Sequence, residues 1–99
     1  MSGKSSLHSA DESPALRIDK LLWFLRFSRN RVIAKRLTEK GHVRLNGRRV
    51  DRGHILVRAN DIITLPVGRD VYVIRIIFLP VRRGNALAAQ SCYERLQTG

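Results

Sequence analysis

Cysteine is nearly absent from this sequence of 99 residues, which contains only Cys92. A single cysteine excludes an internal disulfide bond, and no nearby histidine has the spacing needed to share a zinc ion with it. Residues 1–14 are rich in serine and lack the apolar core of a signal peptide. We therefore expect a cytoplasmic protein that holds no metal and no other cofactor.

Long apolar runs are also missing. The longest, Val71 to Leu79, is interrupted by Arg75 and is too short to cross a bilayer. The chain shows no internal repeat, and its length allows one small domain but not two. We expect a monomer with one thin hydrophobic core.

Acidic residues are scarce. Eight Asp and Glu oppose nineteen Lys and Arg, which gives a formal net charge of +11 at pH 7. Residues 17–58 hold 13 of the Lys and Arg and only three of the acids, a net of +10, so the rest of the chain contributes +1. Because a solvated surface normally mixes both signs, this block predicts a polyanionic partner: RNA, DNA or an anionic membrane surface.

The order of patterns along the chain predicts an α+β fold, with two short helices on a small antiparallel sheet and a short C-terminal helix. Apolar spacing predicts helices over 18–27, 31–40 and 85–96, and alternation predicts strands around 42–50, over 62–65 and over 71–79. We expect a flexible tail over residues 1–15, a folded domain over 16–80, and a basic loop with the last helix over 81–99.

The first predicted helix is apolar on nearly every side. Ile18, Leu21, Leu22 and Leu25 share one face, and Trp23, Phe24 and Phe27 lie on the other. Such a helix must be covered on two sides, and we expect the aromatic side to pack internally rather than against a partner. Asp19 in the first turn is expected to anchor the helix start and hold a neighbouring arginine, not to act as a catalytic acid.

The second predicted helix has clear start and stop signals. Asn30 can cap it with a side-chain oxygen, and Gly41 can adopt positive φ just past its end. Spacing of 100° per residue predicts an apolar face and an opposite basic face: Ile33, Ala34 and Leu37 on one, and Arg31, Lys35 and Arg36 on the other.

The next segment predicts a β-hairpin. Asn46-Gly47 is the dipeptide that a type I′ turn favours, because both central residues need positive φ. Val43, Leu45 and Val50 are expected to point inward. Further on, we expect a turn over 66–70 and a strand over 71–79 that is buried on both faces.

These residues resemble a known RNA-binding domain. The segment from Arg17 to Val50 resembles the αL motif of the S4-type domain, named for a small-subunit ribosomal protein. The shared positions are Arg17, Asp19, Asn30, Arg31, Ala34, Leu37, Gly41, Val43, Leu45, Asn46 and Gly47. Two of them depart mildly: Asn30 replaces the usual Ser, and Leu45 replaces a Val. The resemblance implies that residues 16–80 form an S4-type domain.

A longer resemblance is to the stand-alone heat shock protein fifteen family. It includes the run from Arg17 to Trp23 and a second set downstream: Arg82, Arg83, Gly84, Ala89, Tyr93 and Glu94. The resemblance implies binding to the rRNA of free large ribosomal subunits that still hold peptidyl-tRNA, in their rescue or recycling. Relatives often carry a longer basic C-terminal extension, whereas this chain stops at Gly99.

The candidate RNA-binding residues are the cations of this region. Arg forks hold phosphate oxygens bidentately, and Lys acts as a mobile point charge. The main candidates are Arg17, Lys20, Arg31, Lys35, Arg36, Lys40, Arg44 and Arg48, with Arg26, Arg29 and Arg49 at the rim. His42 could bond a ribose or a base edge, or be an exposed strand residue, and Asn46 is expected mainly to shape the turn. Arg82 and Arg83 could extend this surface or form a solvated loop.

Three other functions compete with this interpretation. An enzyme is disfavoured, because no paired carboxylates, activated nucleophile or Gly-rich phosphate loop occurs. A DNA-binding helix-turn-helix protein would explain two short helices and high charge, but not the hairpin that follows at once. A general binder of structured RNA would show the same charge and the same hydrogen-bonding groups, so this alternative stays open. We expect structured RNA as the partner and no membrane.

Overall fold

The computed structural model describes residues 13–96 and has an α+β architecture, as predicted. Its helices are α2 (Ile18–Phe24), α3 (Arg31–Glu39) and α4 (Ala86–Gln90). Its strands are β1 (Leu16–Arg17), β2 (Val43–Leu45), β3 (Arg48–Val50), β4 (Leu56–Val57), β5 (Ile62–Val67), β6 (Asp70–Ile76) and β7 (Tyr93–Leu96). The first twelve residues of the tail expected over 1–15 lie outside the described residues.

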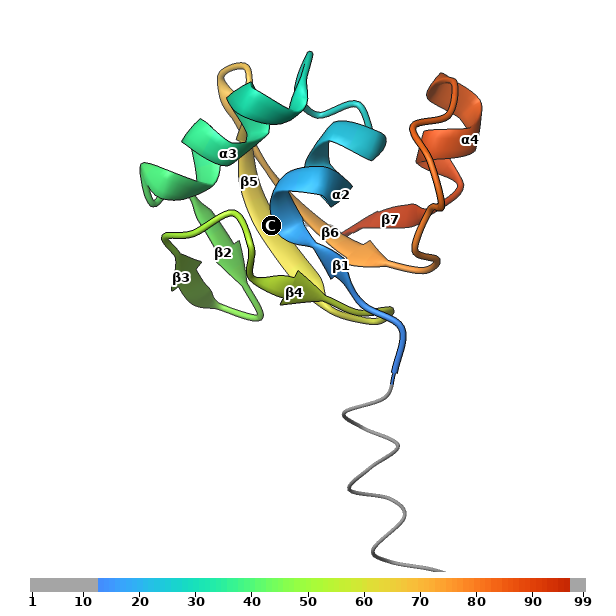
Figure 1. Ribbon diagram of the computed structural model, residues 1–99, viewed down its shortest axis with the longest axis horizontal. Coiled ribbons are helices and arrows are strands. Elements are labelled where there is room, and N and C mark those ends of the chain that lie inside the picture. Colours follow the sequence, from blue (N-terminus) through green and yellow to red (C-terminus); the bar gives the residue numbers. More distant parts are fainter. Residues whose placement is uncertain (1–12, 97–99) are drawn as a thin grey trace, which may run out of the picture.

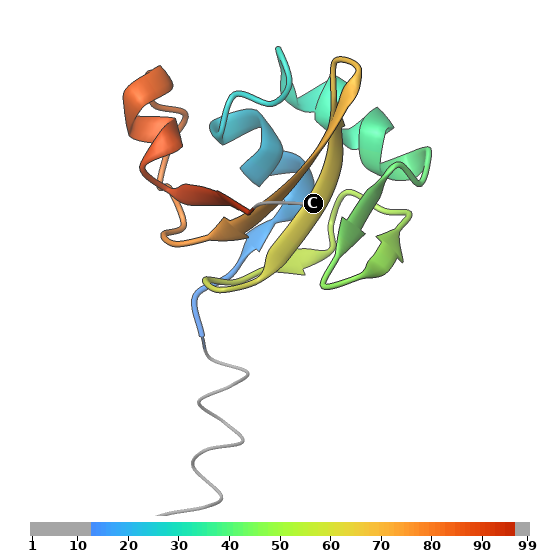
Figure 2. The same cartoon turned by 180° about the vertical axis from the view of Figure 1, so that it is seen from behind.

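Five strands form one antiparallel sheet in the order β3-β2-β5-β6-β7, and β1 pairs with β4 beside it. Helices α2 and α3 lie together against one face of this sheet, and α4 stands at its β7 end (Figure 1). The view from behind shows the long β5–β6 hairpin running across the middle of the fold (Figure 2). This arrangement places the hairpin β2–β3 and α3 at one end of the molecule and α4 at the other.

The core lies between the helices and the sheet. Its fully buried side chains come from every layer: Ile18, Leu21, Leu22, Ala34, Val43, Val57, Ile63, Leu65, Ile74 and Ile76. Burying one such Leu or Ile contributes about 1.5–3 kcal/mol relative to exposure. The aromatic side of α2 is covered as well, since Phe24 is buried and the Phe27 ring lies 5.1 Å from that of Tyr93 and 6.3 Å from that of Tyr72. The internal packing predicted for this side is confirmed.

Helix α2 ends three residues earlier than predicted. Arg26 adopts φ of 69°, its amide donates to the Trp23 carbonyl, and the Phe27 amide donates to the Leu22 carbonyl at 2.9 Å. This pair of bonds is the Schellman arrangement that closes many helices, usually with glycine at the left-handed position. An arginine there gives no sequence signal, which explains why the prediction ran on to residue 27.

Helix α3 begins and ends close to its predicted limits, but its buried face is rotated. The Asn30 side chain accepts a hydrogen bond from the Ile33 amide at 2.9 Å, and Gly41 follows the helix with φ of 77°. Ala34 and Thr38 are buried, whereas Ile33 is 42% exposed, so its predicted burial is wrong. Thr38 can be buried because its hydroxyl donates to the Lys35 carbonyl at 2.7 Å.

The cap gives a direct prediction. Asn30→Ala is expected to cost about 1 kcal/mol, because one free amide of α3 loses its acceptor. That lowers Tm by about 4–8 °C in a domain of this size, measured by calorimetry. Asn30→Ser, which keeps a capping oxygen, is the control and should stay within a few tenths of a kcal/mol of the parent chain. Equal losses in both variants would contradict a capping role.

The hairpin is confirmed in detail. Asn46 and Gly47 have φ of 52° and 84°, as a type I′ turn requires. The Asn46 side chain also accepts from the Ile62 amide at 2.8 Å and donates to Asp61 at 3.1 Å, which ties the turn to the start of β5. Val43 and Val50 are buried and Leu45 is half-buried, as predicted.

The second half of the chain departs more from prediction. Strand β5 continues through Val67, so the turn is at residues 68–69 rather than over 66–70. Strand β6 is not buried on both faces: Ile74 and Ile76 face the helices, whereas Val71 and Arg75 are exposed. The outer face of this strand has no second layer of structure within residues 13–96.

The C-terminal helix is shorter than predicted. It ends at Gln90, and Tyr93–Leu96 forms strand β7, paired antiparallel with β6. Backbone amides of Ile77 and Phe78 both donate to the Cys92 carbonyl as the two strands meet. The free edge of β6 supplies partners that a helix over 91–96 would leave unused, which outweighs the local helical pattern.

Candidate nucleic-acid interface

Helix α3 carries the densest group of candidate cations. Lys35, Arg36 and Lys40 are exposed, and Arg29 lies exposed in the loop before the helix. Their only acidic neighbour on α3 is Glu39, whose carboxylate lies 3.9 Å from the Lys35 ammonium. A pair this exposed contributes little, so most of the positive charge of α3 is uncompensated.

The hairpin β2–β3 extends this charge around the edge of the sheet. Its register pairs Arg44 with Arg49, two like charges directly opposite each other, and Leu45 with Arg48. Because Val43 and Val50 point inward, alternation turns Arg44 and Arg49 to the other face of the hairpin. Like charges in cross-strand register destabilise a free hairpin, so the arrangement favours an anionic partner.

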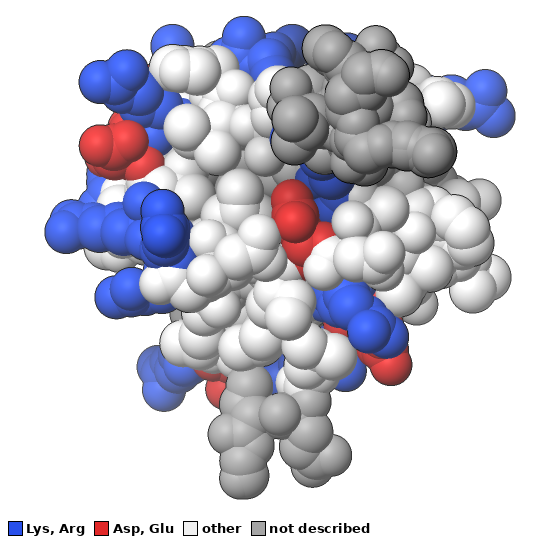
Figure 3. Space-filling model, turned by 90° about the horizontal axis from the view of Figure 1, so that it is seen from below, with Lys and Arg blue, Asp and Glu red and all other residues white. Residues whose placement is uncertain are grey.

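These cations gather at one end of the molecule. Figure 3, the view from below, shows Lys and Arg atoms along the left edge, the side of the hairpin β2–β3, with few acidic atoms among them. We call this the basic surface, and it comprises Arg17, Lys20, Arg31, Lys35, Arg36, Lys40, Arg44, Arg48 and Arg49. His42 is exposed in the connection between α3 and β2.

A buried carboxylate lies beneath the basic surface. Asp19 is 1% exposed and accepts two hydrogen bonds from the Arg17 guanidinium, at 3.2 and 2.9 Å. Its other neighbour is the Arg31 guanidinium, at 3.7 Å. Asp19 therefore joins the start of α2 to the start of α3 and orients two candidate RNA-binding side chains. The predicted anchoring role of Asp19 is confirmed.

Gly53 completes this anchor, and sequence reasoning missed it. The Gly53 carbonyl accepts from the Asp19 amide at 3.1 Å, and a Cβ atom at Gly53 would lie 2.5 Å from the Asp19 carboxylate. Only glycine allows this close approach. Arg52 and His54, on either side, are exposed beside the anchor and were not among the predicted residues. The one signal for Arg52 was its place in the basic block.

Two further contacts position candidate cations near α2. The Lys20 ammonium lies 5.4 Å from the centre of the Phe24 ring, a cation–π contact that holds it against α2. Arg26 donates to the Gly84 carbonyl at 2.8 Å, which draws it toward the 80–84 loop and away from the hairpin. The structure thus brings the α3 and hairpin cations together and leaves Arg26 at the margin.

The exposed cations of this site can make ionic contacts and donate hydrogen bonds. Within residues 13–96, no three His, Cys, Asp or Glu side chains are placed to hold a metal ion, and no helix has the length and apolar character to cross a membrane. Burial, with Tyr72 nearby, raises the pKa of Tyr93 above its usual value.

Comparison with known proteins agrees with this fold. Residues 16–63 match the S4 domain family. A solved structure of Vibrio cholerae heat shock protein 15, described as trimeric, is 34% identical with a TM-score of 0.79, covering 84% of this chain and 83% of that one. Two helices, a hairpin and their cations thus define an S4-type domain.

Curated relatives extend the match beyond that domain. The heat shock protein 15 homolog of Aeromonas salmonicida is 33% identical over 88 residues, 89% of this chain. Heat shock protein 15 of Escherichia coli strain K12 is 35% identical over 85 residues, 84% of this chain. The chain belongs to the heat shock protein 15 family, and the resemblance found in the sequence is confirmed.

The chain spans only 66% and 63% of the length of these two relatives. A more distant match is the small ribosomal subunit protein uS4 of Acidithiobacillus ferrooxidans, 38% identical over 50 residues, which are 50% of this chain and 24% of that protein. The part shared with the ribosomal protein is about as long as the S4 domain match.

Proposed function

We propose that this chain is a non-enzymatic protein that binds structured RNA of the large ribosomal subunit through the basic surface. The observation that carries the proposal is the buried Asp19, which orients Arg17 and Arg31 at the edge of the basic surface. Among residues 13–96, the other cations of this surface have one acidic partner, the exposed Glu39 beside Lys35. A buried anchor for exposed arginines has value when those arginines must meet a partner in a fixed geometry.

The mode of binding follows from the same geometry. Each phosphate that a cation neutralises releases condensed counterions, so affinity falls steeply as salt rises. The deep, narrow major groove of A-form RNA hides its base edges, so a surface of this kind reads shape and backbone more than sequence. We therefore propose a folded rRNA element as the target, with tRNA as a second contact.

The proposed role is the rescue or recycling of free large subunits that carry a nascent chain on tRNA, in the cytoplasm. Membership of the heat shock protein 15 family and the partial match to a ribosomal protein support a ribosome-associated role. We propose a monomer as the free state, although the Vibrio cholerae relative is described as trimeric. Light scattering on the purified chain measures this state.

Sedimentation tests the ribosomal role. The purified chain is mixed with separated small subunits, empty large subunits, and large subunits that carry peptidyl-tRNA. We expect selective migration with the large subunits that carry peptidyl-tRNA. Binding to all three particles that disappears together as salt rises would instead indicate a general RNA binder, and competition by duplex DNA alone would favour the DNA-binding alternative.

A further inference from the structure

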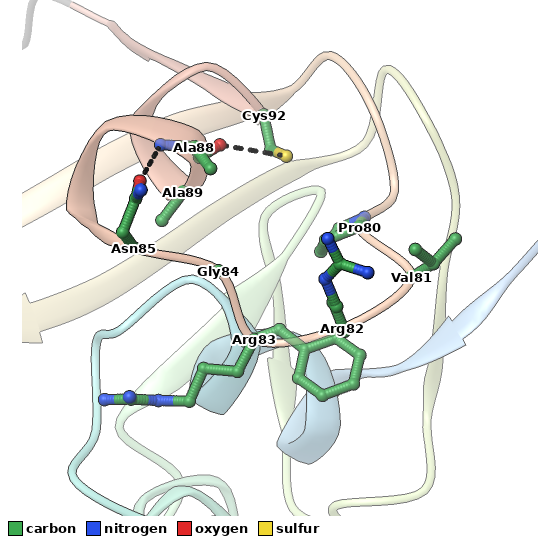
Figure 4. A pocket seen from close by; sticks show the side chains of 10 residues that line it. Pro80, Val81, Arg82, Arg83, Gly84, Asn85, Ala88, Ala89 and Cys92 are labelled. Atoms are coloured by element: carbon green, nitrogen blue, oxygen red, sulfur yellow. Dashed lines mark hydrogen bonds between the residues drawn. The ribbon is translucent and has the colours of Figure 1, made fainter.

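A second cationic site lies outside the basic surface, between the 80–84 loop and helix α4. A cavity of about 480 Å³ opens there, within the range of about 300–1,000 Å³ that holds small ligands. Its apolar lining includes Phe24, Val81 and Ala89. Figure 4 shows Pro80, Val81 and Arg82 on one side of the opening and Ala88, Ala89 and Cys92 on the other.

The charged residues that line this cavity are all positive. Arg82 and Arg83 belong to its lining, and residues 77–92 contain no Asp or Glu. Arg82 is exposed, whereas Arg83 is half-buried, with its Nε atom donating to the Trp23 carbonyl at 3.2 Å. One arginine is thus fixed against the end of α2, and the other is left at the surface.

The loop and helix that line the cavity pack closely at one point. Gly84 approaches α4 so closely that a Cβ atom there would lie 3.0 Å from the Ala88 Cβ atom. Val81 is 90% exposed beside the opening, so its apolar side chain is accessible to a bound group. An apolar cavity beside two arginines matches a ligand with one flat apolar part and one anionic part.

The cavity also adjoins the basic surface. Phe24, which lines it, carries Lys20 over its ring at 5.4 Å, and Arg26 holds the Gly84 carbonyl at 2.8 Å. An RNA lying on α2 would therefore pass the opening. Unpaired bases that are splayed out of a helix are the parts of RNA that proteins hold by stacking and apolar contact.

We propose that this cavity receives one unpaired base of the bound RNA, with Arg82 and Arg83 on the adjoining phosphates. The proposal rests on the RNA-binding function proposed above and adds a second, single-stranded element to its target. Stacking of one base in such a site is worth about 1–3 kcal/mol, so an available base should tighten binding by roughly tenfold.

The test uses three short fluorescent RNA hairpins of the same stem: one fully paired, one with a single bulged adenosine, and one with an abasic residue at the bulge. Anisotropy titrations compare their Kd values at fixed salt. The adenosine and abasic hairpins have the same length and the same phosphates and differ only in one base, so the difference between their Kd values reports on that base. We expect the adenosine hairpin to bind about tenfold more tightly than the abasic one.

Two variants locate the base. Ala88→Phe fills the cavity from an exposed helical position and should abolish the difference between adenosine and abasic hairpins. Leu87→Phe is the matched control, because Leu87 is 78% exposed on the same helix and does not line this cavity, and the difference should persist. Arg82→Ala should weaken both bulged hairpins, whereas Arg75→Ala, which removes an exposed charge that does not line the cavity, should weaken them less.

Each contrary result has its own meaning. Equal Kd values for the adenosine and abasic hairpins would overturn the base site and leave RNA binding intact. A difference that survives Ala88→Phe would place the base elsewhere and overturn the proposal as well. Failure of all three hairpins to bind would overturn the proposed function together with this inference.

Discussion

Replacing Lys35 and Arg36 with alanine is expected to weaken binding to purified large ribosomal subunits about thirtyfold. Both side chains are exposed on α3, and each contact with a phosphate is worth about 1 kcal/mol at a hydrated surface. Alanine has the highest helix propensity, so α3 keeps its stability in the variant. The measurement is Kd as a function of salt, by filter binding or anisotropy.

The slope of log K against log salt distinguishes lost phosphate contacts from a structural effect of the substitutions. Two lost contacts should lower the slope of log K against log salt by about two. Arg75→Ala/Arg95→Ala is the matched control, because it removes the same charge from β6 and β7, at the far end of the sheet from β2–β3. Equal losses in the two double variants would show that only net charge matters, and would count against a defined basic surface.

The parts of this fold that were predicted correctly depend on neighbouring residues. Asn30 caps α3 through an amide three positions on, and the Asn46-Gly47 turn needs only its own two φ angles. Asp19 holds Arg17, two positions away. In each case the sequence contains both partners of the interaction within a few residues, so their chemistry alone decides the local structure.

The parts that were predicted wrongly depend on distant partners. Residues 93–96 have a local helical pattern, and they become strand β7 only because the edge of β6 is free to pair with them. Thr38 is buried in place of Ile33 because of the way α3 packs against α2. The apolar spacing of α3 defines its buried face only to within a fraction of a helical turn, so the sequence did not decide between the two residues. Arg26 adopts positive φ and bonds to Gly84, 58 positions away.

The candidate site also has features that were predicted from the sequence and features that were not. Composition alone located the basic block, and the resemblance supplied its motif positions. Alternation around Val43 predicted an outward Arg44, whereas the place of Arg49 directly opposite Arg44 follows only from the pairing of β2 with β3. Gly53 was missed because its role appears only when Asp19, 34 positions earlier, packs against it. Three-dimensional contact between separate segments supplies what the sequence pattern lacks.

The anchor formed by Asp19 and Gly53 gives the largest expected effect on stability. Gly53→Ala should lower the free energy of unfolding by about 2 kcal/mol, because the new Cβ atom must displace a buried carboxylate from 2.5 Å. Asp19→Ala should cost a similar amount through the lost hydrogen bonds of Arg17. The side chains of Arg17 and Arg31 are 44% and 41% exposed, so water can solvate them and the loss stays below that of a fully buried pair. Each change lowers Tm by about 10 °C.

A double-mutant cycle separates this contact from general destabilisation. In Asp19→Ala/Gly53→Ala the carboxylate that the new Cβ atom would meet is gone, so the combined cost should fall short of the sum by about 1 kcal/mol. Gly68→Ala is the control partner, because a Cβ atom there meets nothing within 4 Å, and its cost should simply add to that of Asp19→Ala. Urea unfolding of the six chains measures all the terms. Additive costs of Asp19→Ala and Gly53→Ala would show that Gly53 acts through its backbone alone. They would contradict the idea that close packing of Gly53 against Asp19 fixes the two arginines.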